Sequence, residues 1–126
     1  MVNLLFVGIG SAIGGIIRYW IGLHIKSGSS FPVATCIVNL VGSLLIGLLS
    51  DWLERSYSHG NLVPVIRSFA VIGFCGGFTT FSTFSNETFR MLQHSQFAAA
   101  SLYLFLSIFS GLAAVFAGYT IAKSIG

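Results

Sequence analysis

The chain alternates between four long apolar stretches and three short polar connections. The apolar stretches cover residues 2–25, 31–53, 62–92 and 97–122. Each is long enough to match the roughly 20 helical residues that cross the hydrocarbon core of a bilayer. Backbone N–H and C=O groups find no water in that core, so a helix, which pairs them internally, is expected for each stretch. The pattern therefore predicts an all-α integral membrane protein with four transmembrane helices.

The composition supports this class. Of the 126 residues, 55% are hydrophobic and only 7% are charged, and the mean hydropathy is +0.90. A soluble domain carries about 25% charged residues, so this chain lacks the side chains to cover a surface in water. Its length corresponds to one domain, residues 1–126. No basic segment precedes the first apolar stretch, which we therefore expect to stay as a span and not to be cleaved as a signal peptide.

Residues 73–85, in the third apolar stretch, differ from an ordinary membrane helix. Their sequence is GFCGGFTTFSTFS, in which three glycines precede five hydroxyl side chains interleaved with phenylalanines. Glycine loosens a helix, and irregular backbone is tolerated at membrane depth only where it is buried in protein or lines a cavity. We expect the helix to break near residues 76–80, with a functional site beside the break.

Each predicted span also carries a pair of small residues four positions apart. The pairs are Gly10 and Gly14, Ser43 and Gly47, Gly73 and Gly77, and Ser107 and Gly111. Small residues at this spacing let helix backbones approach closely in lipid. We therefore expect a tight bundle without a wide internal pore, so that a transport route would most simply form between two subunits.

The positive charges give almost no preferred orientation. Four spans place both termini and the middle connection on one side of the membrane. The charges divide evenly, with Arg55, Arg67 and Lys123 on that side and Lys26, Arg90 and Arg18 on or toward the other. The positive-inside rule then leaves two interpretations open. One is a weakly determined single orientation, and the other is insertion both ways with pairing to an inverted copy.

Polar side chains at membrane depth are few. Three share one face of the second span: Thr35, Asn39 and Ser43. Three more lie at helical spacing in the fourth span: Tyr103, Ser107 and Ser110. Either set serves as hydrogen-bonding glue between helices or as a polar track for an ion. Arg18, about three quarters along the first span, either extends to the membrane interface or holds an anion at a pore mouth.

Several classes of function lack support in the sequence. No catalytic triad, carboxylate pair, nucleotide loop or zinc pattern is present, and the scattered basic residues do not suggest nucleic-acid binding. Cys36 and Cys75 are interpreted as small apolar filler. The three acids, Asp51, Glu54 and Glu87, lie near predicted span ends, which argues against a proton relay. Neutral hydroxyls, one amide and phenyl rings at depth suit a small anion better than a cation.

The third-span segment closely resembles the signature of the Fluc/CrcB fluoride channels. The match runs from Gly76 to Glu87 as GGFTTFSTFSNE, with support from GIGSAIG and Arg18-Tyr19 in the first span and Asn39-Leu40-x-Gly42 in the second. The resemblance extends over the whole chain in length, number of spans and order of motifs. It implies a dual-topology, antiparallel homodimer in the bacterial inner membrane, with two pores through which fluoride leaves the cell passively.

The resemblance also implies roles for individual residues. Phe81 and Phe84 correspond to pore phenylalanines, and the positive edge of a phenyl ring suits an anion. Asn39 would donate its amide N–H to the ion. Further pore donors would be Tyr103, Ser107, Thr35, Ser82, Thr83 and Ser110, with Arg18 at the pore mouth. Gly76 and Thr79 correspond to residues whose main-chain carbonyls hold a structural sodium ion at the dimer axis.

One position departs from the family pattern, and two other functions stay open. The fourth span of the family commonly carries a second serine four residues after the first, where this chain has Gly111. A small dual-topology exporter of cations or drugs is one alternative, although it would normally need a carboxylate within the membrane. The other is an assembly protein whose hydroxyls only join helices. Measurement of fluoride flux separates both from a channel.

Overall fold

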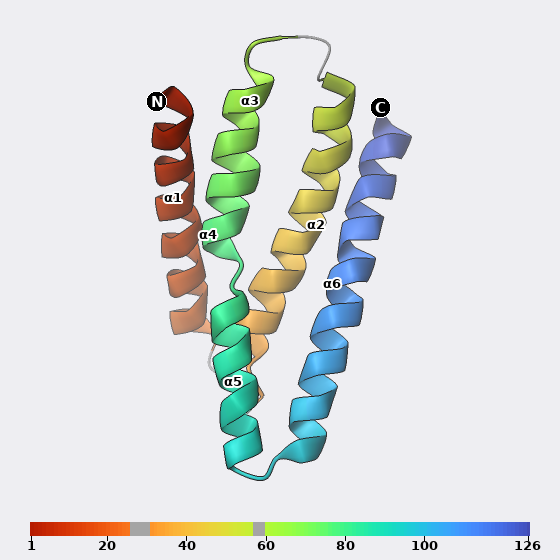
Figure 1. The fold of residues 1–126 in the computed structure, drawn as a ribbon. Helices are drawn as coiled ribbons and strands as arrows, with labels where there is room; N and C mark the ends of the chain where they lie inside the picture. Colours follow the sequence, from red (N-terminus) through yellow and green to blue (C-terminus); the bar gives the residue numbers. More distant parts are fainter. Residues whose placement is uncertain (26–30, 57–59) are drawn as a thin grey trace.

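The computed structural model describes residues 1–25, 31–56 and 60–126, in which every regular element is helical (Figure 1). Four helical segments are long and apolar enough to cross a membrane: Val2–His24, Val33–Ser56, Val63–Gln93 and Phe97–Ile125. They match the four predicted spans to within a few residues. The first predicted connection, with Lys26, lies outside the described residues, as does part of the second.

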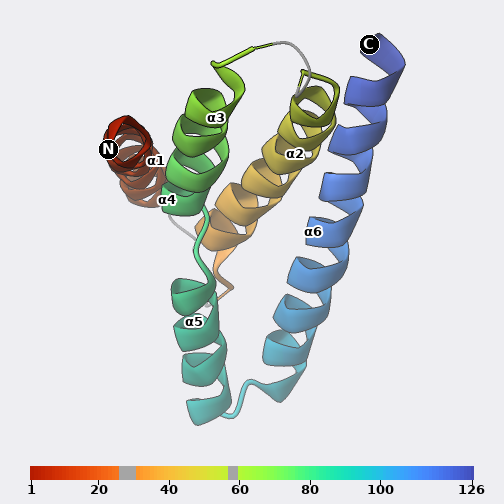
Figure 2. The ribbon, with the colours of Figure 1, turned by 45° about the horizontal axis from the view of Figure 1, so that its top comes forward.

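The third span is built from several elements, whereas the other three are single helices. The elements in chain order are α1 (Val2–His24), α2 (Val33–Ser56), α3 (Val63–Ile66), the π-helix η1 (Arg67–Cys75), α4 (Gly76–Phe78), α5 (Phe81–Gln93) and α6 (Phe97–Ile125). Both termini lie at the end of the bundle where α3 begins, and the turn between α5 and α6 lies at the opposite end (Figure 1). α1 packs along η1 and α4, and α2 packs along α6, as Figures 1 and 2 both show.

Glycines make the contact between α1 and the first half of the third span. A methyl group added at Gly10 or Gly14 would overlap the main chain of the third span. Conversely, one added at Gly73 would meet the main chain of α1, and one at Gly77 would overlap that of Ser11. The two predicted small-residue pairs therefore face each other, and the expected close approach of backbones in lipid is confirmed here.

The contact between α2 and α6 differs from the prediction on one side. An added methyl group at Gly47 would overlap the main chain of α6, as expected. On α6, however, the glycine in tight contact is Gly118, whose added methyl group would overlap the main chain of α2. One at Gly111 would meet only the Ser43 hydroxyl, at an ordinary 3.7 Å. The prediction that Gly111 forms the close contact is wrong, because the backbones approach most closely nearer the end of α6.

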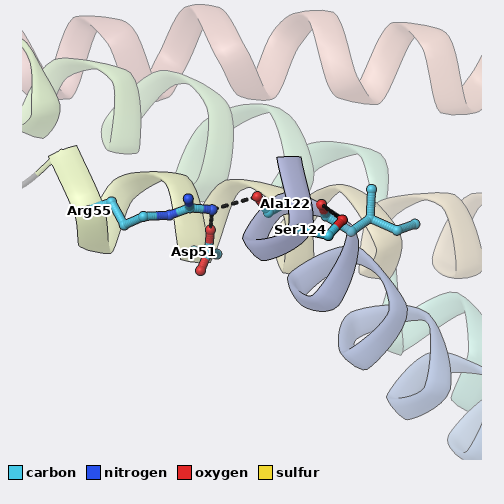
Figure 3. A network of polar contacts seen from close by, with 5 residues as sticks. Asp51, Arg55, Ala122 and Ser124 are labelled. Carbon is cyan, nitrogen blue, oxygen red and sulfur yellow. Dashed lines mark hydrogen bonds and ion pairs between the residues drawn. The ribbon is translucent and has the colours of Figure 1, made fainter. Parts of the chain in front are cut away.

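A polar network closes the α2–α6 pair at the end that carries the termini (Figure 3). The guanidinium Nη2 of Arg55 donates to the carboxylate of Asp51, one turn earlier in α2, and to the carbonyl oxygen of Ala122 in α6. Asp51 is buried despite lying near the helix end. A buried carboxylate needs such a partner, since an unpaired one is strongly destabilising.

Candidate functional site

The third span breaks at two residues. Thr79 (φ −86°, ψ 159°) and Thr80 (φ −151°, ψ 118°) are extended, whereas Gly76–Phe78 before them and Phe81–Gln93 after them are helical. The predicted break near residues 76–80 is therefore confirmed and narrowed to its last two positions. Gly76 and Gly77 remain helical and lie in the last turn before the break.

The break redirects backbone hydrogen bonds. In a continuous α-helix the Thr80 and Thr83 N–H groups would donate to the carbonyls of Gly76 and Thr79. Here the Thr80 N–H donates to Asn39 Oδ1 at 2.8 Å, and the Thr83 N–H donates to Thr80 Oγ1 at 3.2 Å. Within the described part of the chain, the Gly76 and Thr79 carbonyls consequently accept no hydrogen bond from a backbone N–H.

Two side chains from other helices bind main-chain groups at the break. Asn39, in α2, holds Thr80 at both main-chain groups, because its Nδ2 also donates to the Thr80 carbonyl at 3.2 Å. Arg18, in α1, donates from Nε to the Gly77 carbonyl at 3.1 Å. The Asn39 amide carries a second N–H, so the contact with Thr80 orients this side chain without using all its donors.

A cleft of about 290 Å³ opens beside the break, and we call it the break cleft. It brings together four residues predicted from the sequence: Asn39, Phe81, Phe84 and Ser107. Ser43, Thr79, Thr80 and Gly111 also line it. The break cleft therefore contains an amide, several hydroxyls and two phenyl rings, and no acidic side chain lines it among the described residues. Gly111 faces this space and Ser110 does not line it, so the departure from the family pattern removes a hydroxyl from the cleft itself.

The two predicted pore phenylalanines lie in unlike environments. Phe81 is 78% exposed, whereas Phe84 is 8% exposed, and their ring centroids are 5.9 Å apart at 46°. Phe84 also packs on Tyr103, with ring centroids 5.0 Å apart. Tyr103 is fully buried, and its hydroxyl has no hydrogen-bond partner among the described residues. A buried unpaired hydroxyl is costly, so this position suits a polar guest.

A second cleft of about 410 Å³, the arginine cleft, lies where α1, α2 and the break meet. Arg18, Thr35, Thr80 and Thr83 line it. The Thr35 hydroxyl donates to Glu87 Oε1 at 2.6 Å. Glu87 is near a span end, as expected, but it is partly buried and contacts the polar face of α2. Thus a carboxylate does lie beside the predicted track, a contact that the linear sequence does not reveal.

The remaining hydroxyls gather around Thr80. Its Oγ1 donates to Thr83 Oγ1 at 3.0 Å and lies 3.4 Å from the hydroxyl of Ser82. Thr80 is the N-cap of α5, and sequence reasoning did not single it out. The signal that points to it is a threonine directly before a helical segment, which is a preferred capping residue.

Comparisons with known proteins identify the family of this chain. A family described as CrcB-like protein, Camphor Resistance (CrcB), matches residues 5–119. The chain belongs to this family. It is 39% identical to the fluoride-specific ion channel FluC of Flavobacterium psychrophilum over 99% of this chain and 100% of that protein. It is 40% identical to the FluC of Methylobacterium nodulans over 100% of both, and 44% identical to the FluC of Chlorobaculum tepidum over 98% and 96%.

Membership of the CrcB family and the four apolar helices together give the location of the chain. It is a multi-pass protein of the bacterial cytoplasmic membrane. The break cleft and the arginine cleft therefore lie on segments that cross the bilayer. Polar and charged side chains are energetically costly there, so they usually have hydrogen-bond partners or mark a functional site.

Proposed function

We propose that this chain is a fluoride channel that lets fluoride leave the cell by passive flow. Similar proteins from three bacteria carry the name fluoride-specific ion channel FluC, which denotes a non-enzymatic activity. The observation that carries the proposal is the composition of the break cleft. Its described lining offers amide and hydroxyl donors and phenyl rings but no carboxylate, which favours an anion over a cation.

Fluoride is held in this proposal by donors and ring edges. Asn39 is oriented by its contact with Thr80 and has a further amide N–H for the ion. The edges of Phe81 and Phe84 carry partial positive charge. The other residues assigned to the ion path are Tyr103, Ser107, Thr35, Ser82, Thr83 and Ser110, with Arg18 at its mouth. The unpaired Tyr103 hydroxyl next to Phe84 supports an extension of the path beyond the break cleft.

The working unit in this proposal is an antiparallel homodimer with two pores. One stripe of α5 is exposed although it lies in a membrane span, and it consists of Phe81, Ser82, Ser85, Asn86 and Phe89. Hydroxyls and an amide are poorly accommodated by lipid tails, so a second protein surface is the better cover. The even division of positive charges permits both orientations, and an inverted second copy is the partner that closes a two-fold dimer.

A structural sodium ion at the dimer axis completes the proposed assembly. Gly76 and Thr79 would hold it through their main-chain carbonyls, which accept no backbone hydrogen bond within the described residues. Gly76 is also exposed, and nothing lies within 4 Å of the position that a methyl group would occupy. Carbonyl oxygens suit a hard cation, and broken membrane helices present them in this way. The ion would link the two subunits because it attracts the carbonyl oxygens of both.

Glu87 supports one alternative, which is a proton-coupled exporter of cations or drugs. Its partly buried carboxylate accepts a hydrogen bond from Thr35, so the carboxylate that such an exporter needs is present near the track. The break cleft, however, does not include Glu87. A channel requires only a fluoride gradient, whereas an exporter requires a proton gradient, and this difference separates the two.

Fluoride efflux from proteoliposomes tests the proposal. Purified protein is reconstituted with internal potassium fluoride, valinomycin supplies potassium permeability, and a fluoride electrode records release without a proton gradient. We expect rapid release of fluoride, whereas a chloride electrode should record no release from matched potassium chloride liposomes. Chloride release as fast as fluoride release, or no release of either, would contradict the proposal.

The phenylalanine assignment is tested in the same assay. Phe81→Ile and Phe84→Ile remove the ring edges, and we expect each to slow efflux by at least about tenfold, equivalent to about 1.4 kcal/mol of barrier. Phe116→Ile is the matched control, because Phe116 in α6 is 72% exposed and does not line the break cleft. Gel filtration in detergent checks that dimers persist. Wild-type efflux in both Phe81→Ile and Phe84→Ile removes the assignment.

A further inference from the structure

One face of α1 leads from the glycine contact to the helix break. Gly10, Gly14 and Arg18 are four residues apart, so they share one face of the helix. The glycines let α1 lie directly against the main chain of η1 and α4. Arg18 follows one turn later, and its Nε reaches the Gly77 carbonyl at 3.1 Å. The close packing of α1 therefore brings a guanidinium to the last turn before the break.

The contact replaces a hydrogen bond that the break removes. In a continuous helix the Gly77 carbonyl would accept from the Phe81 N–H, but the extended residues Thr79 and Thr80 intervene. The Arg18 Nε–H donates to the Gly77 carbonyl in place of the Phe81 N–H. An arginine from α1 therefore binds a carbonyl at the C-terminal end of α4. Arginine near a helix C-terminus stabilises it through such bonds and through the helix dipole.

We infer that Arg18 is a positioning residue for the carbonyls of Gly76 and Thr79. By holding the Gly77 carbonyl, it keeps Gly76–Phe78 helical up to the break. This matters because two consecutive glycines have the greatest freedom to leave helical geometry when their hydrogen bonds are lost. The carbonyls of Gly76 and Thr79, which lie before and after the Gly77 carbonyl, then keep a fixed direction. The inference rests on the proposed function, since it deepens the role of those two carbonyls as sodium ligands.

A role in positioning differs from a role as a charge at the pore mouth. For positioning, the N–H at the Nε position matters. For attraction of anions, the positive charge matters. Glutamine places its Nε2 at the same number of bonds from the backbone as arginine Nε and is neutral. Lysine keeps the charge but has a methylene at that place. Methionine has neither a donor nor a charge, and it is similar in length to glutamine.

The test is sodium-dependent stability of the purified full-length protein, with Arg18→Gln, Arg18→Lys and Arg18→Met beside the wild type. Thermal unfolding is followed while sodium chloride replaces N-methyl-D-glucamine chloride at constant ionic strength. We expect the sodium dissociation constant, obtained from the rise of the unfolding temperature with sodium concentration, to stay within about twofold of wild type in Arg18→Gln. In Arg18→Lys and Arg18→Met we expect it to rise by about tenfold, equal to about 1.4 kcal/mol. Circular dichroism checks that each variant is folded.

The comparison of Arg18→Gln with Arg18→Lys decides the outcome even if Arg18→Met does not fold. Wild-type behaviour of Arg18→Lys together with a tenfold rise in Arg18→Gln would overturn the inference in favour of charge. Equal sodium dependence in all variants would overturn it as well, and so would a wild type that sodium does not stabilise.

Fluoride efflux of the wild type is measured separately. Efflux with equal sodium dependence refutes only the inference, whereas the expected pattern without efflux refutes only the fluoride channel.

Discussion

The two halves of the third span have nearly opposite properties, although only Thr79 and Thr80 separate them. The first half, from α3 to α4, packs along α1 through glycines on both sides. The second half, α5, packs on α6 and leaves hydroxyl side chains exposed. The first half lies in close backbone contact with α1, whereas the second exposes hydroxyl side chains. The lesson is that one span supplies both the support and the site, and that the break lets each half face a different neighbour.

The two halves also differ in the hydrogen bonding of the ends that meet at the break. At the end of the first half, Arg18 holds the Gly77 carbonyl. Within the described residues, the carbonyls of Gly76 and of Thr79, in the break itself, accept no backbone N–H. The second half begins with N–H groups, and Thr80 caps one of them with its own side chain. Oxygen atoms therefore gather on one side of the break and donors on the other, which fits neighbouring sites for a cation and an anion.

The glycine contact is the place where a single change has the largest expected effect. Gly14→Ala adds a methyl group that would overlap the main chain of the third span. We expect the free energy of unfolding in detergent to fall by about 3 kcal/mol, because neither backbone can move away without loss of its own packing. Denaturant unfolding followed by tryptophan fluorescence measures this change.

Gly8→Ala is the control on the same helix, since nothing lies within 4 Å of its added methyl group. Alanine is the better helix former, so the stability of Gly8→Ala should be unchanged or slightly raised. Equal destabilisation of both variants would contradict close packing at Gly14 as the cause of the loss.

The contact of Asn39 with the break is expected to give the second largest effect. Asn39→Leu removes both hydrogen bonds to the main chain of Thr80 and leaves these groups unpaired within the membrane. We expect a loss of about 2 kcal/mol in unfolding free energy and faster exchange of the Thr80 amide hydrogen. Hydrogen exchange with mass spectrometry checks the second point.

Ser43→Ala is the matched control for Asn39→Leu. Ser43 lies one turn further along α2 and lines the same break cleft, but it does not contact Thr80 through a hydrogen bond. The amide exchange of Thr80 should therefore be unchanged in Ser43→Ala. If Asn39→Leu leaves that exchange slow as well, Asn39 does not hold the break, and its role is confined to the cleft.

The cap of the second half is expected to give the smallest effect. Thr80→Val keeps the shape of the side chain and removes the oxygen that accepts the Thr83 N–H. We expect a loss of about 1 kcal/mol, typical of an N-cap, and fraying limited to the first turn of α5. Thr120→Val removes a hydroxyl that only donates to the Phe116 carbonyl within α6, and it should be nearly neutral. Equal unfolding midpoints for the two variants would contradict a capping role.

Much of the fold and part of the site could be predicted from the sequence. The spans follow from apolar length, and the break follows from glycines beside hydroxyls, both of which are local properties. Asn39, Phe81, Phe84 and Ser107 were predicted and share the break cleft. The close contact at Gly118 was not predicted, because which glycine meets a backbone depends on where two helices approach most closely. The burial of Asp51 and the contact of Glu87 with Thr35 likewise depend on neighbouring helices.

The sequence by itself determined that this chain spans the membrane four times, that its third span breaks, and that neutral donors and phenyl rings lie beside the break. These properties depend on residues near one another in the chain. Only the tertiary structure decided which side chains take the groups that the break frees. Arg18 and Asn39 do so from 59 and 41 residues away. A backbone group in a membrane must find a partner, and the partner is whichever donor or acceptor the helix packing brings within reach.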